Sequence, residues 1–193
     1  MQNNISLLPH TPEHLKALLE GREVYERRFK VKVADGVRDF LIGPEVSAEF
    51  LARLTTAPAP DPWKDGFGVL HLAENILIGF CSFTGTPTAD GTVEIAYGIA
   101  PAYQGRGYAT EAAQALIAYA LASGLVRTIQ AHTLPQRNAS TRVLQKCDFT
   151  MIEEIIHPED GVVWRWELKK EVGGRKSEVR DQRSERTKLT SDL

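Results

Sequence analysis

In the first third of the chain the pattern of hydrophobic and polar residues is typical of a strand in one segment and of helices in two others. A short apolar run at 5–9 predicts a first strand, and 11–29 reads as a helix with Thr11 as its N-cap. A second helix is predicted over 43–55. The segment 56–66 holds three prolines and is predicted to be a loop. This part of the chain therefore predicts mainly helices behind one strand.

The rest of the chain is dominated by strand patterns. The predicted elements are a hairpin at 67–85 that turns at Ala73–Asn75, a strand at 91–100, a helix from about 105 to 123, a strand at 126–134, a helix at 138–147 and a final hairpin over 149–170. Helices first, then a mostly antiparallel sheet interrupted by two helices, indicate an α+β (mixed α/β) fold with helices on both faces of one sheet.

The charge pattern suggests where the folded domain ends. We expect one domain over 1–170. The segment 171–193 has mixed charge and almost nothing to bury, so it is predicted to be disordered or a lone solvated helix. It is either a tail without a role or a helix that binds a partner.

The strand at 91–100 has two unlike faces when it is read with a period of two. One face is bulky and suits a core: Val93, Ile95, Tyr97 and Ile99. The other is made of small residues and one carboxylate: Glu94, Ala96, Gly98 and Ala100. The small side chains predict a groove over the sheet with Glu94 beside it. The alternative is a solvent face on which Glu94 is an ordinary surface charge.

The loop after this strand is predicted to bind an anion. Gly105 and Gly107 permit backbone conformations that other residues resist, and the helix that follows offers unpaired N–H groups at the positive end of its dipole. Arg106 adds a positive charge, and Thr110 offers a hydroxyl or caps the helix. Together they predict a cradle suited to a diphosphate.

Composition excludes several classes of protein. The chain has 193 residues, 42% of them hydrophobic, and a net charge of −2, which suits one domain and argues against a nucleic-acid binder. No apolar run approaches the roughly 20 residues that a membrane span needs. The first residues lack the pattern of a secretory signal, so we expect a cytoplasmic protein. Cys81 and Cys147 lie among apolar residues and are expected to be buried thiols, with a disulfide or a catalytic thiol as the alternatives.

Other anion-binding motifs fit less well. The segment "GRGYAT" lacks the third glycine of a dinucleotide fingerprint, and no Gly-Lys-Ser/Thr follows to complete a P-loop. His10 and His14 are spaced as a helical metal pair, but Pro12 and the start of the helix lie between them. We therefore predict no metal site.

Two segments resemble a known family. "QGRGYA" (Gln104–Ala109) and "NASTRVLQKCDF" (138–149) are similar to the motifs of the GNAT superfamily of acetyl-CoA-dependent N-acetyltransferases. The second segment is typical of the Rim-type branch, which includes ribosomal-protein-alanine acetyltransferases. "GVVWRWELK" is similar to the closing strand of the family. The resemblance covers roughly residues 4–170.

The resemblance implies a sheet whose fourth and fifth strands splay apart like a V. The pantetheine arm of acetyl-CoA would lie in the V, and a backbone N–H near Ile99 or Ala100 would stabilise the oxyanion. Asn138 comes one place after the family's asparagine, which aligns with Arg137. The expected cofactor-binding residues are Ile99, Gln104, Gly105, Arg106, Gly107, Tyr108, Ala109, Thr110 and Asn138.

The resemblance also suggests which residues do the chemistry. Glu94 is the expected base for the amine, directly or through a water, and His132 is the rival base. Many members carry a tyrosine that protonates the leaving thiolate, where this chain has Leu144, so Ser140 becomes the candidate hydroxyl. Asp148 replaces a family glycine at a turn.

The predicted function is transfer of an acetyl group from acetyl-CoA to a primary amine within a ternary complex. The acceptor is either a protein N-terminus or a small-molecule amine. A non-catalytic acyl-CoA-binding regulatory module is the alternative, and a nucleotide-sugar or NAD binder is a third reading. Family members often pair through their C-terminal strands, so a homodimer is also raised. The expected partners include no nucleic acid and no membrane.

Overall fold

The computed structural model describes residues 4–42, 52, 54, 59–158 and 161–169. The predicted tail at 171–193 lies outside the described residues, and so does most of the helix predicted over 43–55. The boundary of the domain at residue 170 therefore stays a prediction. The strands are β1 (Ile5–Pro9), β2 (Lys32–Val33), β3 (Phe67–His71), β4 (Ile76–Phe83), β5 (Thr92–Ile99), β6 (Thr128–Thr133), β7 (Thr150–His157) and β8 (Gly161–Lys169).

These strands form one sheet in the order β1-β3-β4-β5-β6-β8-β7, with β2 on β4. Strand β2 pairs with β4 and β5 pairs with β6 in parallel, and the other described pairs are antiparallel. The mixed fold and the mostly antiparallel sheet are thus as predicted. The short β2 adds one to the strand numbers, so the family's fourth and fifth strands are β5 and β6 here.

The helices are α1 (Pro12–Glu20), α2 (Arg22–Phe29), α3 (Asp39–Ile42), α5 (Pro62–Asp65), the 3-10 turn η1 (Pro101–Tyr103), α6 (Tyr108–Ala122) and α7 (Ala139–Lys146). Thr11 caps α1 as predicted, since its side chain accepts a hydrogen bond from the His14 N–H. The single helix predicted over 11–29 is wrong: Gly21, with a φ of 153°, separates α1 from α2. The predicted loop at 56–66 contains the short α5, capped by Asp61.

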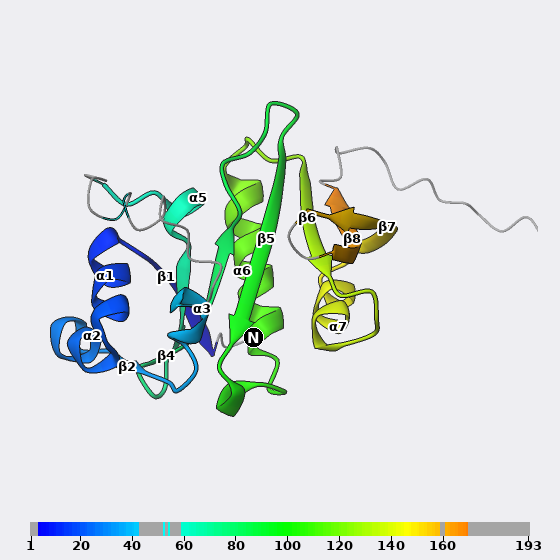
Figure 1. Cartoon of the computed structure of the whole chain (residues 1–193). Helices are drawn as coiled ribbons and strands as arrows, with labels where there is room; N and C mark the ends of the chain where they lie inside the picture. Colours follow the sequence, from blue (N-terminus) through cyan, green and yellow to red (C-terminus); the bar gives the residue numbers. More distant parts are fainter. Residues whose placement is uncertain (1–3, 43–51, 53, 55–58, 159–160, 170–193) are drawn as a thin grey trace, which may run out of the picture.

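Helices cover both faces of the sheet (Figure 1). On one face α6 and α7 pack over a core that includes Ile95, Ile99, Leu116 and Leu144. On the other face α1, α2 and α3 enclose a second core that includes Ala100. The bulky face of β5 thus lies in a core, as predicted, and Ala100, which directly follows β5, belongs to the core on the other face.

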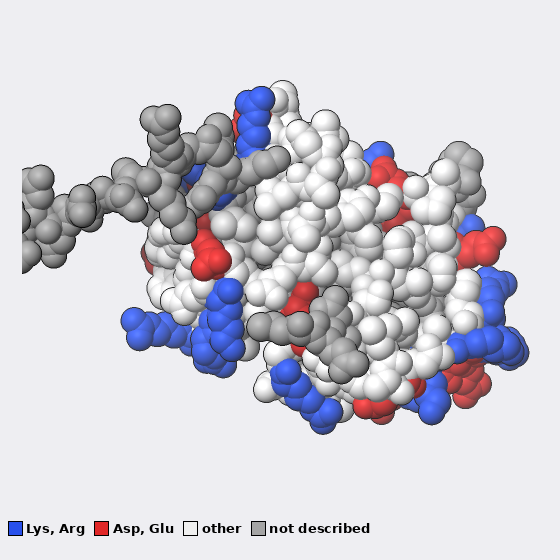
Figure 2. Space-filling model, turned by 180° about the vertical axis from the view of Figure 1, so that it is seen from behind, with Lys and Arg blue, Asp and Glu red and all other residues white. Residues whose placement is uncertain are grey.

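Charged side chains do not gather into one broad patch on the face seen in Figure 2. Lys and Arg side chains lie around the edge of this face, with Asp and Glu side chains among them, and its centre is mainly uncharged. Among the described residues, no helix is both long and apolar enough to cross a membrane.

Candidate functional site

Strands β5 and β6 begin side by side and then separate. Their pairing covers only Thr92↔Thr128, Val93↔Ile129 and Glu94↔Gln130. Strand β5 continues to Ile99, and Figure 1 shows the two strands diverging along their length. Beyond Glu94 the edge of β5 that faces β6 is therefore open, which is the V-shaped splay that the resemblance implies.

Hydrogen bonds to β4 determine which backbone groups of β5 face this opening. The Ala100 N–H donates to the Ile78 oxygen at 2.8 Å, and the Glu94 oxygen accepts from the Thr84 N–H at 3.1 Å. Bonding alternates along a strand, so the even-numbered residues bond β4, and Tyr97 and Ile99 direct their backbone groups toward the opening. Ala100 as an oxyanion donor is therefore wrong, whereas Ile99 remains suitable.

A glycine-rich turn, which we call the cradle (residues 104–110), joins the end of β5 to α6. Gly105 and Gly107 have φ values of 74° and 90°, in the left-handed region that favours glycine. Helix α6 was expected from about 105 but begins at Tyr108, because Gly107 is its N-cap. Gln104 Nε2 donates to the Ile99 oxygen at 2.8 Å and fixes the cradle to the end of β5.

Tyrosines hold the cradle against the turn between β3 and β4. The Tyr108 hydroxyl lies 3.0 Å from His71 Nε2, and the Tyr103 hydroxyl donates to the Glu74 carboxylate at 2.6 Å. The Arg106 guanidinium carbon lies 5.5 Å from the centre of the Tyr103 ring. These contacts keep the N–H groups at the start of α6 in a fixed place.

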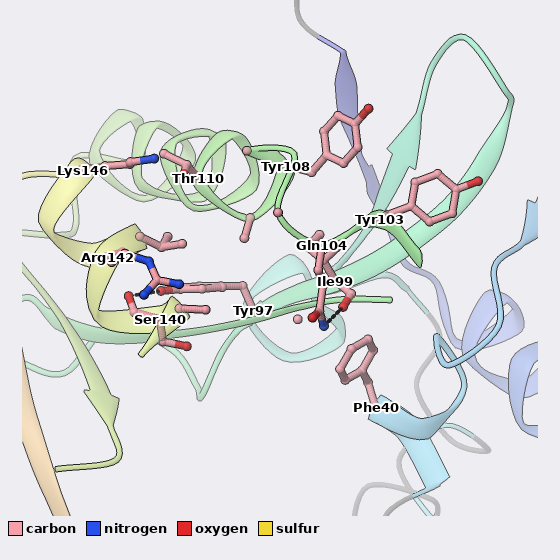
Figure 3. A pocket seen from close by; sticks show the side chains of 16 residues that line it. Phe40, Tyr97, Ile99, Tyr103, Gln104, Tyr108, Thr110, Ser140, Arg142 and Lys146 are labelled. Atoms are coloured by element: carbon pink, nitrogen blue, oxygen red, sulfur yellow. Dashed lines mark hydrogen bonds between the residues drawn. The ribbon is translucent and has the colours of Figure 1, made fainter. Parts of the chain in front are cut away.

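A first cavity of about 430 Å³ runs along this region, between β5, the cradle and α7. Eight of the predicted site residues line it: Ile99, Gln104, Gly105, Gly107, Tyr108, Ala109, Thr110 and Ser140. Arg106, Asn138 and Glu94 do not line it. Figure 3 shows the cradle residues at one end and α7 at the other.

Several lining residues were not predicted from the sequence. Arg142, Val143 and Lys146 come from α7, Tyr97 from β5 and Phe40 from α3. A helix that starts at Ala139 places Arg142, Val143 and Lys146 on one face. Their spacing could therefore have predicted that they line the same wall. The two basic side chains make the α7 wall positive.

Asn138 and Ser140 have different surroundings at the start of α7. Asn138 is the N-cap, and its Oδ1 accepts from the Thr141 N–H at 3.0 Å. Its side chain thus holds the helix end that carries Ser140 into the wall of the cavity. Leu144, at the place of the family's tyrosine, is fully buried.

Tyr97 reaches across the opening from β5 to α7. Its hydroxyl donates to the Ser140 backbone oxygen over a long 3.4 Å, as Figure 3 shows. Burial, with a smaller contribution from Cys147, raises the pKa of Tyr97 above its ordinary value. The phenol is therefore protonated at neutral pH and is a hydrogen-bond donor.

A second cavity of about 260 Å³ lies on the other face of β5. Most of its lining residues are apolar, among them Leu15, Leu41, Phe80, Phe83 and Ala96, and Lys64 and Asp65 also line it. Three residues line both cavities: Phe40, Tyr97 and Gly98. A Cβ on Gly98 would lie 2.5 Å from the Phe40 ring, so a side chain at this position would require the Phe40 ring to move.

Glu94 and His132 form a pair where β5 and β6 separate. The Glu94 Oε1 lies 2.6 Å from His132 Nδ1, and the side chains are 28% and 14% exposed. Among the described residues, His132 Nε2 is buried without a hydrogen-bond partner. Neither side chain lines either of these two cavities, but Ala96, which lines the second cavity, is the next residue after Glu94 on the same face.

The remaining candidates for chemistry are buried. Cys81 and Cys147 are free thiols, as expected, and burial raises their pKa values to about 12 and about 11. Burial, and to a lesser extent His14, lowers the pKa of His10 to about 3. Among the described residues no three His, Cys, Asp or Glu side chains are grouped to hold a metal ion.

Two sequence comparisons relate this chain to known proteins. The profile of the acetyltransferase (GNAT) domain matches residues 4–150. An uncharacterized N-acetyltransferase p20 of Bacillus licheniformis is 30% identical over 83 residues, which are 43% of this chain and 47% of that protein, so the match spans about half of the relative.

Solved structures of acetyltransferases share the fold. The ribosomal L7/L12 α-N-protein acetyltransferase RimL, in complex with coenzyme A, superposes with a TM-score of 0.59 at 15% identity, over 87% of this chain and 95% of that one. A spermidine N-acetyltransferase SpeG chimera from Vibrio cholerae and hSSAT gives 0.61 at 16% identity, over 86% and 96%. Because the profile covers most of the sequence, this chain belongs to the acetyltransferase (GNAT) domain family.

Proposed function

We propose that this protein is an N-acetyltransferase that moves the acetyl group of acetyl-CoA to a primary amine. The observation that carries the proposal is the continuous first cavity, which joins the cradle to the open edge of β5. One end offers backbone N–H groups at a helix start to a diphosphate. The other end offers the open edge of a strand to an extended arm. This suits coenzyme A, which is bound to RimL.

Coenzyme A would be held by residues from three elements. Gly105, Gly107 and the first residues of α6 would bind the diphosphate. Arg142 and Lys146 on α7 would add positive charge, which a polyanionic cofactor favours. Ile99 would direct its backbone N–H to the pantetheine arm or to the thioester oxygen. Arg106 would support the cradle and Asn138 would hold the start of α7, and neither residue lines the cavity.

The amine would approach through the second cavity. This cavity meets the first at Phe40, Tyr97 and Gly98, so a nucleophile there faces an acyl group held on the other side. Glu94, supported by His132, would take the proton of the amine through a water, because neither side chain reaches the cavity. If His132 donates its Nδ1 proton to Glu94, Nε2 keeps a lone pair and the pair acts as one base.

The lining of the second cavity favours some acceptors over others. RimL and the SpeG chimera are named for a protein N-terminus and for spermidine. Here Lys64 is paired with Asp61 at 3.4 Å, and the Asp65 carboxylate accepts from the Asp61 N–H at 2.7 Å. The described lining thus favours an amine on an apolar group, including an apolar first residue of a protein, over a polyamine.

A thiol-release screen tests the proposal. The full chain is mixed with acetyl-CoA and a panel of amines: peptides that differ in their first residue, aromatic monoamines and spermidine. Release of free coenzyme A that depends on the amine supports an N-acetyltransferase. Saturable binding of acetyl-CoA without release from any amine would support the regulatory acyl-CoA-binding module instead. Binding of NAD that acetyl-CoA cannot displace would contradict both.

A further inference from the structure

The thioester, if acetyl-CoA binds as proposed above, must lie where the two cavities meet. The donor occupies the first cavity and the amine the second, so the reacting carbon lies beside the residues that line both. These are Phe40, Tyr97 and Gly98. Only Tyr97 among them has a polar side chain. Its side chain extends from the junction toward α7, where the hydroxyl contacts the Ser140 backbone oxygen beside the first cavity.

We propose that Tyr97 is the catalytic residue that donates a hydrogen bond to the departing sulfur of coenzyme A. Its hydroxyl lies on the α7 side of the opening, against the backbone oxygen of Ser140. That contact is 3.4 Å long and hence weak, so it is readily exchanged for a bond to a thiolate. Tyr97 thus supplies from β5 a phenol that Leu144 cannot supply from α7.

The step balances without a further reactant. The amine nitrogen bonds to the acetyl carbon, the C–S bond breaks, and its electron pair stays on sulfur. The proton that the amine loses passes through water to the Glu94–His132 pair. The sulfur leaves as a thiolate that accepts the hydrogen bond of Tyr97 and is protonated by water after release. Tyr97 keeps its own proton, as its raised pKa requires.

The pKa of the thiol of bound coenzyme A tests this inference and needs no acceptor. The absorbance of the thiolate is followed against pH in the protein complex, with the complex of desthio-coenzyme A as the blank. Apolar surroundings alone would raise the thiol pKa. A wild-type complex whose bound thiol has a pKa below that of free coenzyme A supports a donor at the sulfur. A value equal to or above that of free coenzyme A overturns the proposal.

Three variants assign the donor. Tyr97→Phe should raise the pKa of the bound thiol by about one to two units, because a hydrogen bond to a charged group is lost. Tyr119→Phe removes a phenol that lines neither cavity and should leave the thiol pKa unchanged. Ser140→Ala keeps the backbone oxygen that Tyr97 contacts and should also leave it unchanged. If the thiol pKa rises in Ser140→Ala and does not change in Tyr97→Phe, Ser140 is the donor and the proposal is overturned.

The outcome is separable from that of the proposed function. If coenzyme A does not bind, the proposed function fails before the sulfur is examined. If it binds with equal affinity to wild type and Tyr97→Phe, and the thiol pKa is the same in both, only the assignment of Tyr97 fails. With an active acceptor, Tyr97→Phe should also lower kcat by about 100-fold, in the range seen when one donor to a developing charge is removed.

Discussion

The Glu94 carboxylate lies 2.6 Å from His132 Nδ1, at the point where β5 and β6 stop pairing. The two residues are 38 positions apart in the sequence, and the sequence alone offers each of them as a separate candidate for the base. This contact is why we propose the two residues as one base rather than choosing between them.

The first prediction follows from this contact. Glu94→Gln and His132→Gln should each lower kcat by about 10²- to 10⁴-fold, the usual range for a general base. The double variant should be little worse than the worse single variant, because the two residues act as one unit. Steady-state kinetics with the best acceptor, beside acetyl-CoA affinity from calorimetry, measure both. Fully multiplicative losses would show that the residues act separately.

The cradle provides a second prediction. Gly105→Ala should raise the KM for acetyl-CoA by about tenfold, because a φ of 74° is strained for alanine and the strain moves N–H groups of the diphosphate site. Gly124 offers a matched control: its φ is 73°, and a Cβ at either glycine meets nothing within 4 Å. Gly124→Ala should destabilise the fold about as much as Gly105→Ala does, but it should leave the KM for acetyl-CoA unchanged. Equal changes in KM would argue against the cradle.

The α7 wall provides a third prediction. Arg142→Gln and Lys146→Gln should each weaken coenzyme A binding several-fold and reduce its dependence on salt, because each removes a positive charge that faces the cavity. Arg127 does not line the cavity, so Arg127→Gln is the control. Calorimetry at two ionic strengths is the measurement. The α7 assignment is wrong if the control weakens binding as much.

His10 predicts how stability depends on pH. Its pKa is lowered to about 3 in the folded protein, against an ordinary 6.5, because the ring is fully buried. Below pH 6.5 the His10 ring is therefore protonated in the unfolded chain but not in the folded protein. The free energy of unfolding falls as the pH falls. Between pH 7.5 and 5 this should cost about 2 kcal/mol.

Denaturant unfolding at several pH values measures this effect. His10→Leu should flatten the profile by the same amount, because leucine does not titrate. An unchanged slope in His10→Leu would show that another group is responsible.

The two cysteines provide a fifth prediction. Burial raises the pKa of Cys81 to about 12 and that of Cys147 to about 11, so both thiols should react slowly with an aromatic disulfide at pH 8 in the native protein. Both should react at once in denaturant. Mass spectrometry after timed labelling follows each residue. Rapid native labelling of Cys81 would contradict its buried place beside the second cavity.

Local sequence patterns predicted those parts of the site that are local in the chain. The period of two in 91–100 identified the two faces of β5, and Gly105 and Gly107 identified the cradle, because backbone conformation depends on the residue itself. The end of the helix at Gly21 was missed, although a glycine within a helical pattern is a known signal.

Contacts between distant segments could not be predicted in the same way. The Phe40 ring packs over Gly98 at the junction of the cavities, and the two residues lie on α3 and β5. The Tyr97 side chain packs against a core, as expected, but the contact of its hydroxyl with α7 was not predicted. The positions of such pairs depend on how strands separate and helices pack. The periodicity of hydrophobic residues along the chain does not predict this packing.

A crystal structure of the protein with acetyl-CoA tests the central claim most directly. We expect the diphosphate oxygens at the backbone N–H groups of residues 105–110, the pantetheine arm along the open edge of β5, and the sulfur within hydrogen-bond distance of the Tyr97 hydroxyl. A cofactor bound elsewhere, or a cradle left empty at saturating acetyl-CoA, would contradict the account.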